Sequence, residues 1–538
     1  MRHIPFVTRA ICRLIGPAIL FEAALLAAPC ESMPQLQLAD TKITSAQVVG
    51  AGEFVQPSGP VSPVAAAEYK KLPAFCRVEG LISPTPDSKI EFEVWMPMSG
   101  WNGRYLGVGN GGLAGSINYT AGPVSNAPGM AQALAGGYAT SSTDTGHKAS
   151  ALSADWAVGH PEKVIDYGYR AVHLTAVDAK KIIGVFYDAS GNEALKSYFS
   201  SCSNGGRQAL MEAQRYPSDY IGIIAGDPAW YATHLAAAQI WNTQAILSKP
   251  ESYIPAKKLP AIEAAVLEKC DALDGVKDGV IDDPRKCHFD PAALLCKGAE
   301  SDTCLTRPQV EAMKKIYAGP ASSTGTQIFP GLFGGAETGP GGWGSWIIGS
   351  EPGKSNIYAF GVGALAKMVY QPGWDYRSFN FDRDVAVLDD KLGPVRNATD
   401  PDLGKFKDQG GKLILYHGWN DPDISPLSTT NYYENVAGKM GQKSAEEFLR
   451  VYLVPGMQHC GGGPGATVFG GNLQLALERW VEGGTAPAEV IATKLKTATK
   501  PEDGAARTRP ICPYPQTARY KGAGSTDDAA NFACVTEH

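Results

Sequence analysis

The chain is organised around a short stretch of small residues, Ser201-Cys202-Ser203-Asn204-Gly205-Gly206. An apolar, aromatic run that contains Tyr198 and Phe199 precedes this stretch, and a helix-like segment, Arg207–Arg215, follows it. The pattern predicts a strand, a sharp turn and a helix in this order. Small residues at such a turn allow the helix to pack closely onto the strand.

Ser203 occupies the centre of this turn. In α/β-hydrolases the catalytic serine lies on a turn of this kind, which lifts the hydroxyl clear of the sheet. Gly205 follows Ser203 by two residues, as in the usual pattern, but Ser201 stands two residues before it, where glycine is usual. Ordinary structural turns use the same residue types. The rest of the chain must therefore decide between the two interpretations.

The segments around the turn predict a parallel sheet. Apolar residues recur at helical spacing over residues 162–187, and a short buried strand is expected at residues 221–225. The alternation of helix and strand is typical of βαβ units. We expect an α/β-hydrolase fold built from two parts, residues 29–226 and residues 409–538. Further strands are expected at residues 90–97, 105–108, 412–416 and 448–454.

Residues 227–408 differ in amino-acid composition from both parts. They contain four cysteines, an Asp-rich turn and Gly-rich tracts. A connection of this length is too long for a loop between two strands. We expect a lid domain, inserted after the nucleophile strand and holding its own cross-links. Its aromatic residues include Trp343, Trp346, Tyr358, Phe360 and Trp374.

Length and composition indicate a globular protein of more than one domain. The chain has 538 residues, of which 44% are hydrophobic and 19% are charged. The net charge of -6 gives no basic footprint for nucleic acid or for an anionic membrane surface. We expect neither as a partner.

The first residues predict a signal peptide over residues 1–28. Three arginines precede a mostly apolar run, residues 14–28, that ends in small residues. A membrane anchor is the alternative, but the run is shorter than the ~20 residues that a span needs. A lipoprotein signal is a second alternative, because Cys30 comes almost directly after the apolar run. Pro29, in front of Cys30, argues against it. The protein is expected to be secreted or periplasmic.

Cysteine usage agrees with export. One of the eleven cysteines, Cys12, lies in the signal peptide. An even number in an exported chain predicts five disulfides, and the absence of a Cys-x-x-Cys pair argues against structural zinc. The remaining ten are Cys30, Cys76, Cys202, Cys270, Cys287, Cys296, Cys304, Cys460, Cys512 and Cys534.

The order of residues along the chain selects a base and an acid. In this fold the nucleophile is followed by an acid and then by a histidine. Only His459 lies downstream of Ser203 in a loop that directly follows a late strand, so it is the predicted base. Asp421 follows the preceding strand and is the favoured acid, with Asp423 as the alternative. Such an acid fixes the tautomer of the imidazole, which activates the serine hydroxyl.

Two cysteines are the direct neighbours of the predicted nucleophile and base. If Ser203 and His459 are within hydrogen-bond reach, Cys202 and Cys460 lie near the spacing that a disulfide requires. We therefore expect these two cysteines to be bonded. The alternative, Cys202 as a thiolate nucleophile, fits poorly with an oxidising compartment.

Three motifs together resemble those of the tannase and feruloyl esterase family, which also contains mono(2-hydroxyethyl) terephthalate hydrolase. They are Cys-Ser-x-Gly-Gly at residues 202–206, His-Gly-x-x-Asp at 417–421 and Gly-Met-x-His-Cys at 456–460. The similarity extends over nearly all of the mature chain. It implies an α/β-hydrolase fold with a lid and the catalytic residues Ser203, Asp421 and His459.

The resemblance also implies oxyanion donors and disulfide pairs. The backbone N–H groups of Asn204 and Gly112 would hold the oxyanion. Gly112 belongs to a Gly-rich loop after an upstream strand, where this fold has its second donor; a merely flexible loop is the alternative. Besides Cys202 with Cys460, the implied pairs are Cys30 with Cys76, Cys270 with Cys287, Cys296 with Cys304, and Cys512 with Cys534.

An Asp-rich turn at residues 271–280 has oxygen ligands of the kind that Ca²⁺ prefers. It lacks the closing glutamate of an EF-hand, and on its own it fits an ordinary turn. The resemblance implies a structural calcium site in the lid. Its ligands would be the side chains of Asp271, Asp274 and Asp278 and the carbonyl groups of Val276 and Val280.

The combined prediction is an exported serine esterase that acts on esters of aromatic, phenolic acids such as gallate or ferulate. A terephthalate monoester is an alternative substrate, but its free carboxylate would favour an arginine in the lid pocket. Residues 342–370 contain no arginine, and their basic residues are Lys354 and Lys367. Arg377 or Arg383, which follow in the chain, could reach into the lid pocket. An alternative from another class is a polyphenol-binding protein without catalysis.

Overall fold

The structure is a computed structural model that describes Met1 and residues 28–188, 195–371 and 373–536. Nearly all of the predicted signal peptide lies outside the described residues. Within the described residues, no helix has the length and apolarity needed to cross a bilayer.

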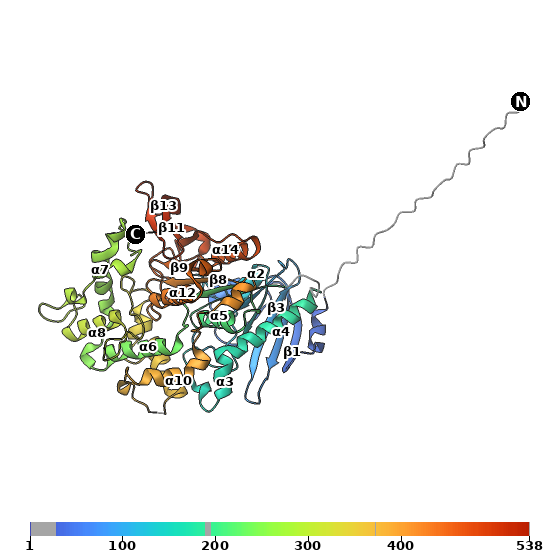
Figure 1. Cartoon of the computed structure of the whole chain (residues 1–538), viewed down its shortest axis with the longest axis horizontal. Helices are drawn as coiled ribbons and strands as arrows, with labels where there is room; N and C mark the ends of the chain where they lie inside the picture. Colours follow the sequence, from blue (N-terminus) through green and yellow to red (C-terminus); the bar gives the residue numbers. More distant parts are fainter. Residues whose placement is uncertain (2–27, 189–194, 372, 537–538) are drawn as a thin grey trace.

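A nine-stranded mixed sheet forms the core of the molecule (Figure 1). Its strands lie side by side in the order β1 (Thr41–Val49), β2 (Phe75–Ile82), β3 (Ile90–Pro97), β5 (Ala139–Thr143), β4 (Arg104–Val108), β6 (Lys196–Cys202), β7 (Gly222–Gly226), β8 (Lys412–Gly418) and β9 (Leu449–Val454). The first three strands and β5 pair antiparallel, and the strands from β5 to β9 are parallel. Parallel strands end at the same edge of a sheet, so the loops after β6, β7, β8 and β9 meet there.

Helices cover both faces of the sheet, as is required for parallel strands that are apolar on both sides. On one face a hydrophobic cluster joins the sheet to α4 (Ala171–Phe186), α5 (Asn204–Arg215), α12 (Pro426–Met440) and α13 (Gln442–Glu446). On the other face a second cluster joins it to α1 (Pro63–Tyr69), α2 (Met130–Ala135) and α14 (Gly470–Gly483). The predicted helix at residues 162–187 is divided into α3 (Pro161–Ile165), a π-helical turn at Asp166–Arg170, and α4.

The long connection between β7 and β8 is mainly helical and contains hydrophobic clusters of its own. It starts after β7, one strand beyond the predicted nucleophile strand β6. Figure 1 shows its labelled helices on one side of the molecule, away from β1 and β3. That residues 227–408 form a separate domain remains a prediction. The helices are α6 (Ala232–Leu247), α7 (Leu259–Cys270), α8 (Arg307–Ala318), α9 (Leu365–Met368), α10 (Asp384–Arg396) and α11 (Gly404–Asp408).

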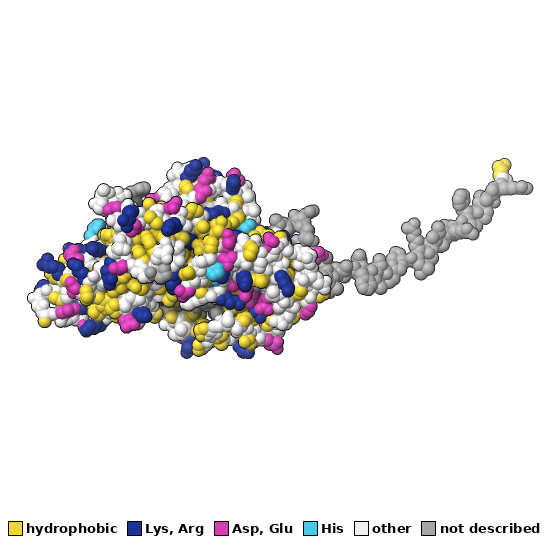
Figure 2. Space-filling model, turned by 90° about the horizontal axis from the view of Figure 1, so that it is seen from below, with side chains coloured by type: hydrophobic (Ala, Val, Ile, Leu, Met, Phe, Trp, Pro, Cys, Tyr) yellow, Lys and Arg dark blue, Asp and Glu magenta, His cyan; other side chains and the backbone are white. Residues whose placement is uncertain are grey.

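Two small antiparallel pairs complete the chain, β10 (Val490–Leu495) with β11 (Ala505–Ile511) and β12 (Thr517–Tyr520) with β13 (Phe532–Val535). All five expected disulfides are present: Cys30–Cys76, Cys202–Cys460, Cys270–Cys287, Cys296–Cys304 and Cys512–Cys534. On the face shown in Figure 2, acidic and basic side chains are interspersed rather than gathered into a field of one sign.

The turn at Ser203 is tighter than the sequence predicted. Strand β6 continues to Cys202 and α5 begins at Asn204, three residues earlier than expected, so Ser203 alone connects them. Its backbone has a φ of 66°, a conformation that costs energy for a residue other than glycine. A Cβ atom on Gly205 would lie 1.8 Å from the Ser201 hydroxyl oxygen, so glycine is required at that position.

This packing gives a stability prediction. Gly205→Ala should lower the free energy of unfolding by about 1–3 kcal/mol, because the added methyl group overlaps Ser201. Gly184→Ala is a matched control in α4, where an added Cβ meets nothing within 4 Å, and alanine should be neutral or stabilising there by up to about 1 kcal/mol. Denaturant unfolding of both variants measures the difference. Equal effects would contradict the close packing at the turn.

Candidate active site

Asp421 and His459 form the central hydrogen bond of the site. The Nδ1 atom of His459 lies 2.7 Å from an oxygen of Asp421. The other Asp421 oxygen accepts the backbone N–H groups of Asp423 and Ile424 at 2.8 and 3.0 Å. These bonds fix the carboxylate, so it can hold the imidazole in one tautomer and one orientation.

The charges of this pair stabilise each other. Burial alone would raise the pKa of Asp421, but His459 and His417 beside it hold that pKa well below its ordinary value. Burial alone would lower the pKa of His459, whereas the charge and hydrogen bond of Asp421, with Asp227 and Asp423 nearby, raise it to about 9. An imidazole in this setting is a strong proton acceptor.

Asp423, the alternative acid, has a different partner. Its side chain accepts a hydrogen bond of 2.8 Å from Gln239 of α6. Burial raises the pKa of Asp423 to about 6. Of the two carboxylates, the structure therefore brings Asp421 to the imidazole and ties Asp423 to the helix that follows β7.

Ser203 is linked to the loop of His459 through its neighbours. Its backbone N–H donates to the carbonyl group of Gly226 at 2.9 Å, and its own carbonyl accepts from Arg207 and Ala229. The bridge from Cys202 to Cys460 has a Cα–Cα distance of 5.9 Å. The turn at Ser203 and the loop that carries His459 are therefore joined covalently, one residue away from each predicted catalytic group.

The two predicted oxyanion donors, Gly112 and Asn204, lie on segments that contact each other. The Asn204 side chain donates to the carbonyl group of Asn110 at 3.0 Å. The hydroxyl group of Tyr167 lies 2.9 Å from both the carbonyl oxygen of Gly112 and the side-chain oxygen of Asn204. As the first residue of α5, Asn204 has a backbone N–H without an acceptor inside the helix.

Sequence reasoning did not identify Asp227 as part of the site. This buried residue follows β7 directly, and one of its oxygens lies 3.9 Å from Nδ1 of His459. Its carboxylate also accepts from the backbone N–H groups of Gly418 and Cys460. A positional signal was available, because site residues in parallel α/β sheets collect at the carboxyl ends of strands.

His417 was quoted as part of a motif, but no role was predicted for it. It is fully buried at the end of β8. Its Nε2 atom lies 2.9 Å from the carbonyl oxygen of Ile424 and 3.3 Å from the Asp421 carboxylate, and its Nδ1 atom lies 2.7 Å from the Thr429 hydroxyl. His417 thus contacts both the acid and the backbone of the loop that carries it.

The connection between β7 and β8 contributes an aromatic ring beside the base. The half-buried ring of Trp346 lies edge-on to His459, with a distance of 4.6 Å between ring centroids. Trp343 is instead buried inside a hydrophobic cluster of the connection. Arg377 pairs with Asp375 and Arg383 with Asp384, and both arginine side chains are mostly exposed.

The turn at residues 271–280 is held by its own carboxylates. Asp271 accepts the backbone N–H groups of Asp278 and Gly279 at 3.1 and 3.0 Å, and Asp274 accepts that of Val276 at 2.8 Å. Val276 and Val280 are both buried in this turn. The side-chain oxygens of Asp271 and Asp274 are therefore bonded to N–H groups of the same turn.

Charge in this turn is crowded and only partly compensated. Arg507 and Arg509 of β11 bind Asp278 at 2.9 and 2.6 Å. Desolvation, with the neighbouring carboxylates, raises the pKa of Asp274 to about 6 and that of Asp282 to about 8. A bound cation would relieve the repulsion between Asp274 and Asp282, a carboxylate that the sequence analysis did not include, whereas Asp278 is already neutralised by the two arginines.

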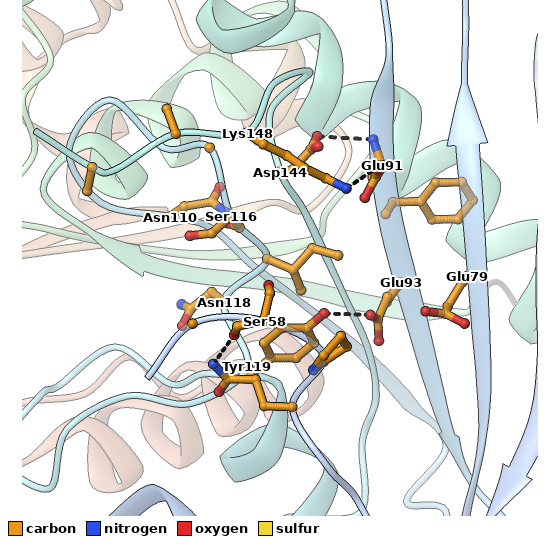
Figure 3. Close-up of a pocket in the computed structure, with 18 of the residues that line it drawn as sticks. Ser58, Glu79, Glu91, Glu93, Asn110, Ser116, Asn118, Tyr119, Asp144 and Lys148 are labelled. Carbon is orange, nitrogen blue, oxygen red and sulfur yellow. Dashed lines mark hydrogen bonds and ion pairs between the residues drawn. The ribbon is translucent and has the colours of Figure 1, made fainter. Parts of the chain in front are cut away.

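A cavity of about 1070 Å³ lies elsewhere, between residues 56–60, residues 115–120 and the strands β2 and β3 (Figure 3). Its lining includes four acidic residues but not Ser203, Asp421 or His459. Glu93 accepts hydrogen bonds from Arg77, Trp95 and Tyr119, and Glu91 pairs with Lys148. Two of its lining residues, Asn110 and Gly111, directly precede Gly112 in the loop of the predicted oxyanion donor.

Comparisons with known proteins give the same family that the motifs resemble. The family described as tannase and feruloyl esterase matches residues 76–535. The chain is 40% identical to an uncharacterized esterase of Xanthomonas campestris, over 96% of this chain and 92% of that protein. It is 35% identical to the mono(2-hydroxyethyl) terephthalate hydrolase of Piscinibacter sakaiensis, over 88% and 86%.

A solved structure agrees with these sequence matches. Feruloyl esterase B from Aspergillus oryzae superposes with a TM-score of 0.80 at 30% identity and covers 94% of this chain and 99% of that one. The predicted α/β-hydrolase fold is thereby confirmed. By family match, by relatives over nearly the whole chain and by fold, the protein is a carboxylic ester hydrolase of the tannase and feruloyl esterase family.

Proposed function

We propose that the protein is an exported serine esterase that hydrolyses esters of aromatic, phenolic acids through Ser203, His459 and Asp421. One observation carries the proposal: the hydrogen bond of 2.7 Å between Asp421 and His459, on a loop bonded covalently to the turn at Ser203. Family membership favours catalysis over the alternative of a polyphenol-binding protein.

In this mechanism His459 acts first as a base. Because its Nδ1–H is directed at Asp421, Nε2 is free to take the proton of the Ser203 hydroxyl group. The serine oxygen attacks the ester carbonyl carbon, and the imidazolium then gives its proton to the departing alcohol. A water molecule, activated by the same imidazole, attacks the acyl-enzyme and releases the acid.

The negative oxygen of each tetrahedral intermediate needs donors in place before the reaction. We assign this role to the backbone N–H groups of Asn204 and Gly112. The hydrogen bonds from Tyr167 and to Asn110 support the assignment, because they link the two donor segments. The N-terminus of α5 adds the positive end of a helix dipole.

An aromatic acyl group is the substrate feature with most support. Relatives of this chain are named as feruloyl esterases and as a terephthalate monoester hydrolase. The edge-on ring of Trp346 beside His459 offers a flat apolar surface next to the base. Arg377 and Arg383, which could have bound a terephthalate carboxylate, pair with neighbouring aspartates instead, which favours phenolic esters over terephthalate monoesters.

Export is the proposed location. Five disulfides fit an oxidising compartment, and the charged and then apolar first residues fit a signal peptide. We also propose structural calcium at residues 271–282, held by Asp271, Asp274 and Asp278 with carbonyl groups of Val276 and Val280. The ion would stabilise the turn against β11 and take no part in the reaction.

Ser203→Ala should lower kcat by several orders of magnitude while leaving the melting temperature nearly unchanged, because only one oxygen atom is removed. The measurement is kcat/KM on methyl gallate, methyl ferulate, chlorogenate and mono(2-hydroxyethyl) terephthalate. We expect the phenolic esters to rank first for the wild type. Unchanged hydrolysis in the variant would end the serine mechanism.

The two carboxylates are separated by matched variants. Asp421→Asn should lower kcat by about 10⁴-fold, the loss typical of a triad without its orienting carboxylate. Asp423→Asn should have a much smaller effect, because the oxygen of the new amide can still accept the hydrogen bond from Gln239. Steady-state kinetics at constant pH compares them, and a reversed ranking would mean that Asp423 is the acid.

Calcium should raise the melting temperature of the chelator-treated protein, because a ligand that binds only the folded state stabilises that state. At a calcium concentration of 100 times Kd, the free energy of unfolding should rise by about 2.7 kcal/mol. Asp274→Asn should abolish this rise. Asp302→Asn, at an exposed position that pairs with Lys257, should not. A melting curve that does not respond to calcium, with no calcium found in the purified protein, would leave an ordinary turn.

A further inference from the structure

Asp227 occupies a position where three segments of the proposed active site meet. It is fully buried and is the first residue after β7. Its backbone N–H donates to the carbonyl group of Tyr416 at 2.8 Å, and its φ of 36° is unusual for a residue other than glycine. This backbone turns away from the sheet and leaves the side chain among the loops that follow the strands.

The carboxylate of Asp227 binds the acid side and the base side of the site at the same time. One oxygen accepts the backbone N–H of Gly418, at the end of β8 and three residues before Asp421, at 3.2 Å. The other accepts the backbone N–H of Cys460, the residue after His459. Both bonds involve a charged acceptor, which makes them stronger than bonds between neutral groups.

The nucleophile is connected to the same position. Gly226, the residue before Asp227, accepts the backbone N–H of Ser203 at 2.9 Å. In the sheet, Cys202 lies opposite Gly226 in the β6–β7 register. Asp227 is therefore linked through one backbone bond to the turn at Ser203 and through its side chain to the loops of Asp421 and His459.

Asp227 also contributes charge next to the base. Its carboxylate oxygen lies 3.9 Å from Nδ1 of His459, beyond hydrogen-bond length but within strong electrostatic range. The other charged or titratable groups around this imidazole are Asp421 and Asp423 after β8, and His417 lies within 4.8 Å of both Asp227 and Asp421. The base thus has, besides the two carboxylates that follow β8, a further one that follows β7.

We propose that Asp227 is a positioning residue of the esterase: its carboxylate holds the loops of Asp421 and His459 together beside Ser203 and adds a second negative charge to the imidazole. This inference rests on the proposed function. It assigns to Asp227 two effects, one on the placement of the base and one on its affinity for a proton.

Asparagine has nearly the shape of aspartate but cannot replace these bonds. A carboxylate offers an acceptor to each of the two N–H groups, whereas an amide offers one oxygen and one NH₂ group. In Asp227→Asn the NH₂ group would face the N–H of either Gly418 or Cys460, donor against donor. One of the two loops must then move, and the negative charge beside His459 is lost.

The test is the pH dependence of kcat/KM for methyl ferulate in Asp227→Asn. On the acidic side of this profile, kcat/KM falls as the base becomes protonated, because the base must be neutral to act. The midpoint of this acid limb therefore reports the pKa of the base in the free enzyme. Since a nearby negative charge raises the pKa of an imidazole, removing it should lower the midpoint of this limb by about one pH unit. The plateau of kcat should fall by about 10- to 100-fold, because the base is displaced.

Asp178→Asn is the matched control. Asp178 is a buried carboxylate in α4 that accepts from the Thr41 hydroxyl at 2.7 Å, far from the loops after β7, β8 and β9. Its variant should lose stability without a shift of the acid limb. A folded Asp227→Asn enzyme that keeps the wild-type midpoint overturns the proposal, whatever its kcat, because the residue would then be merely structural.

A second measurement needs no variant and covers the case in which Asp227→Asn does not fold. In the wild-type protein the amide protons of Gly418 and Cys460 should titrate together in NMR spectra, because one carboxylate accepts both. Burial raises the pKa of Asp227 to about 6, so the shared midpoint should lie near pH 6. Independent or absent titration of the two amides overturns the proposal.

Failure of the proposed function would be recognised separately. If wild type and Ser203→Ala hydrolyse the ester equally, the serine mechanism is wrong, and the amide titration alone then decides on the contacts of Asp227. If Ser203→Ala is inactive and Asp227→Asn keeps the wild-type midpoint, the mechanism stands and only the role of Asp227 is wrong.

Discussion

The bond between Cys202 and Cys460 is the constraint on which the site depends, because it joins strands that are not neighbours. Between β6 and β9 lie β7 and β8, and neighbouring strands are about 4.8 Å apart. The loop after β9 must therefore reach back across the ends of two strands to meet the turn after β6. Closing a loop of this length stabilises the fold by about 5 kcal/mol in the chain-entropy model.

The residues beneath that crossing are those that follow β7 and β8. Asp227 follows the first and Asp421 the second, and both carboxylates are buried under the crossing loop. Buried carboxylates need donors, and here the donors are the N–H groups of the crossing loop and its neighbours, together with His417 and His459. The bridge thus requires the loop after β9 to cross the ends of β7 and β8, and this crossing also brings His459 to Asp421.

Sequence reasoning predicted the parts of this arrangement that depend on order along the chain. The strands at residues 90–97 and 412–416, Asp421 and His459 followed from periodicity and from the order of residues in the fold, and the structure brings the last two together. Asp227 was missed because its partners Gly418 and Cys460 come close only in the folded chain, although its place at the end of β7 was a signal. Asp282 lies just beyond the last residue of the predicted turn and so fell outside the predicted ligand set, although its partner Asp274 is local. The start of α5 was placed three residues late, because Asn204, Gly205 and Gly206 read as turn residues when their packing against β6 is not known.

The sequence separation of the bridges has a consequence for assembly of the protein. Cys460 follows Cys202 by 258 residues, and the four cysteines of the connection between β7 and β8 lie between them in the chain. The intervening cysteines close loops of only 17 and 8 residues, and short loops close at a smaller cost in chain entropy. Early local pairing removes four competing thiols and leaves Cys202 for its distant partner.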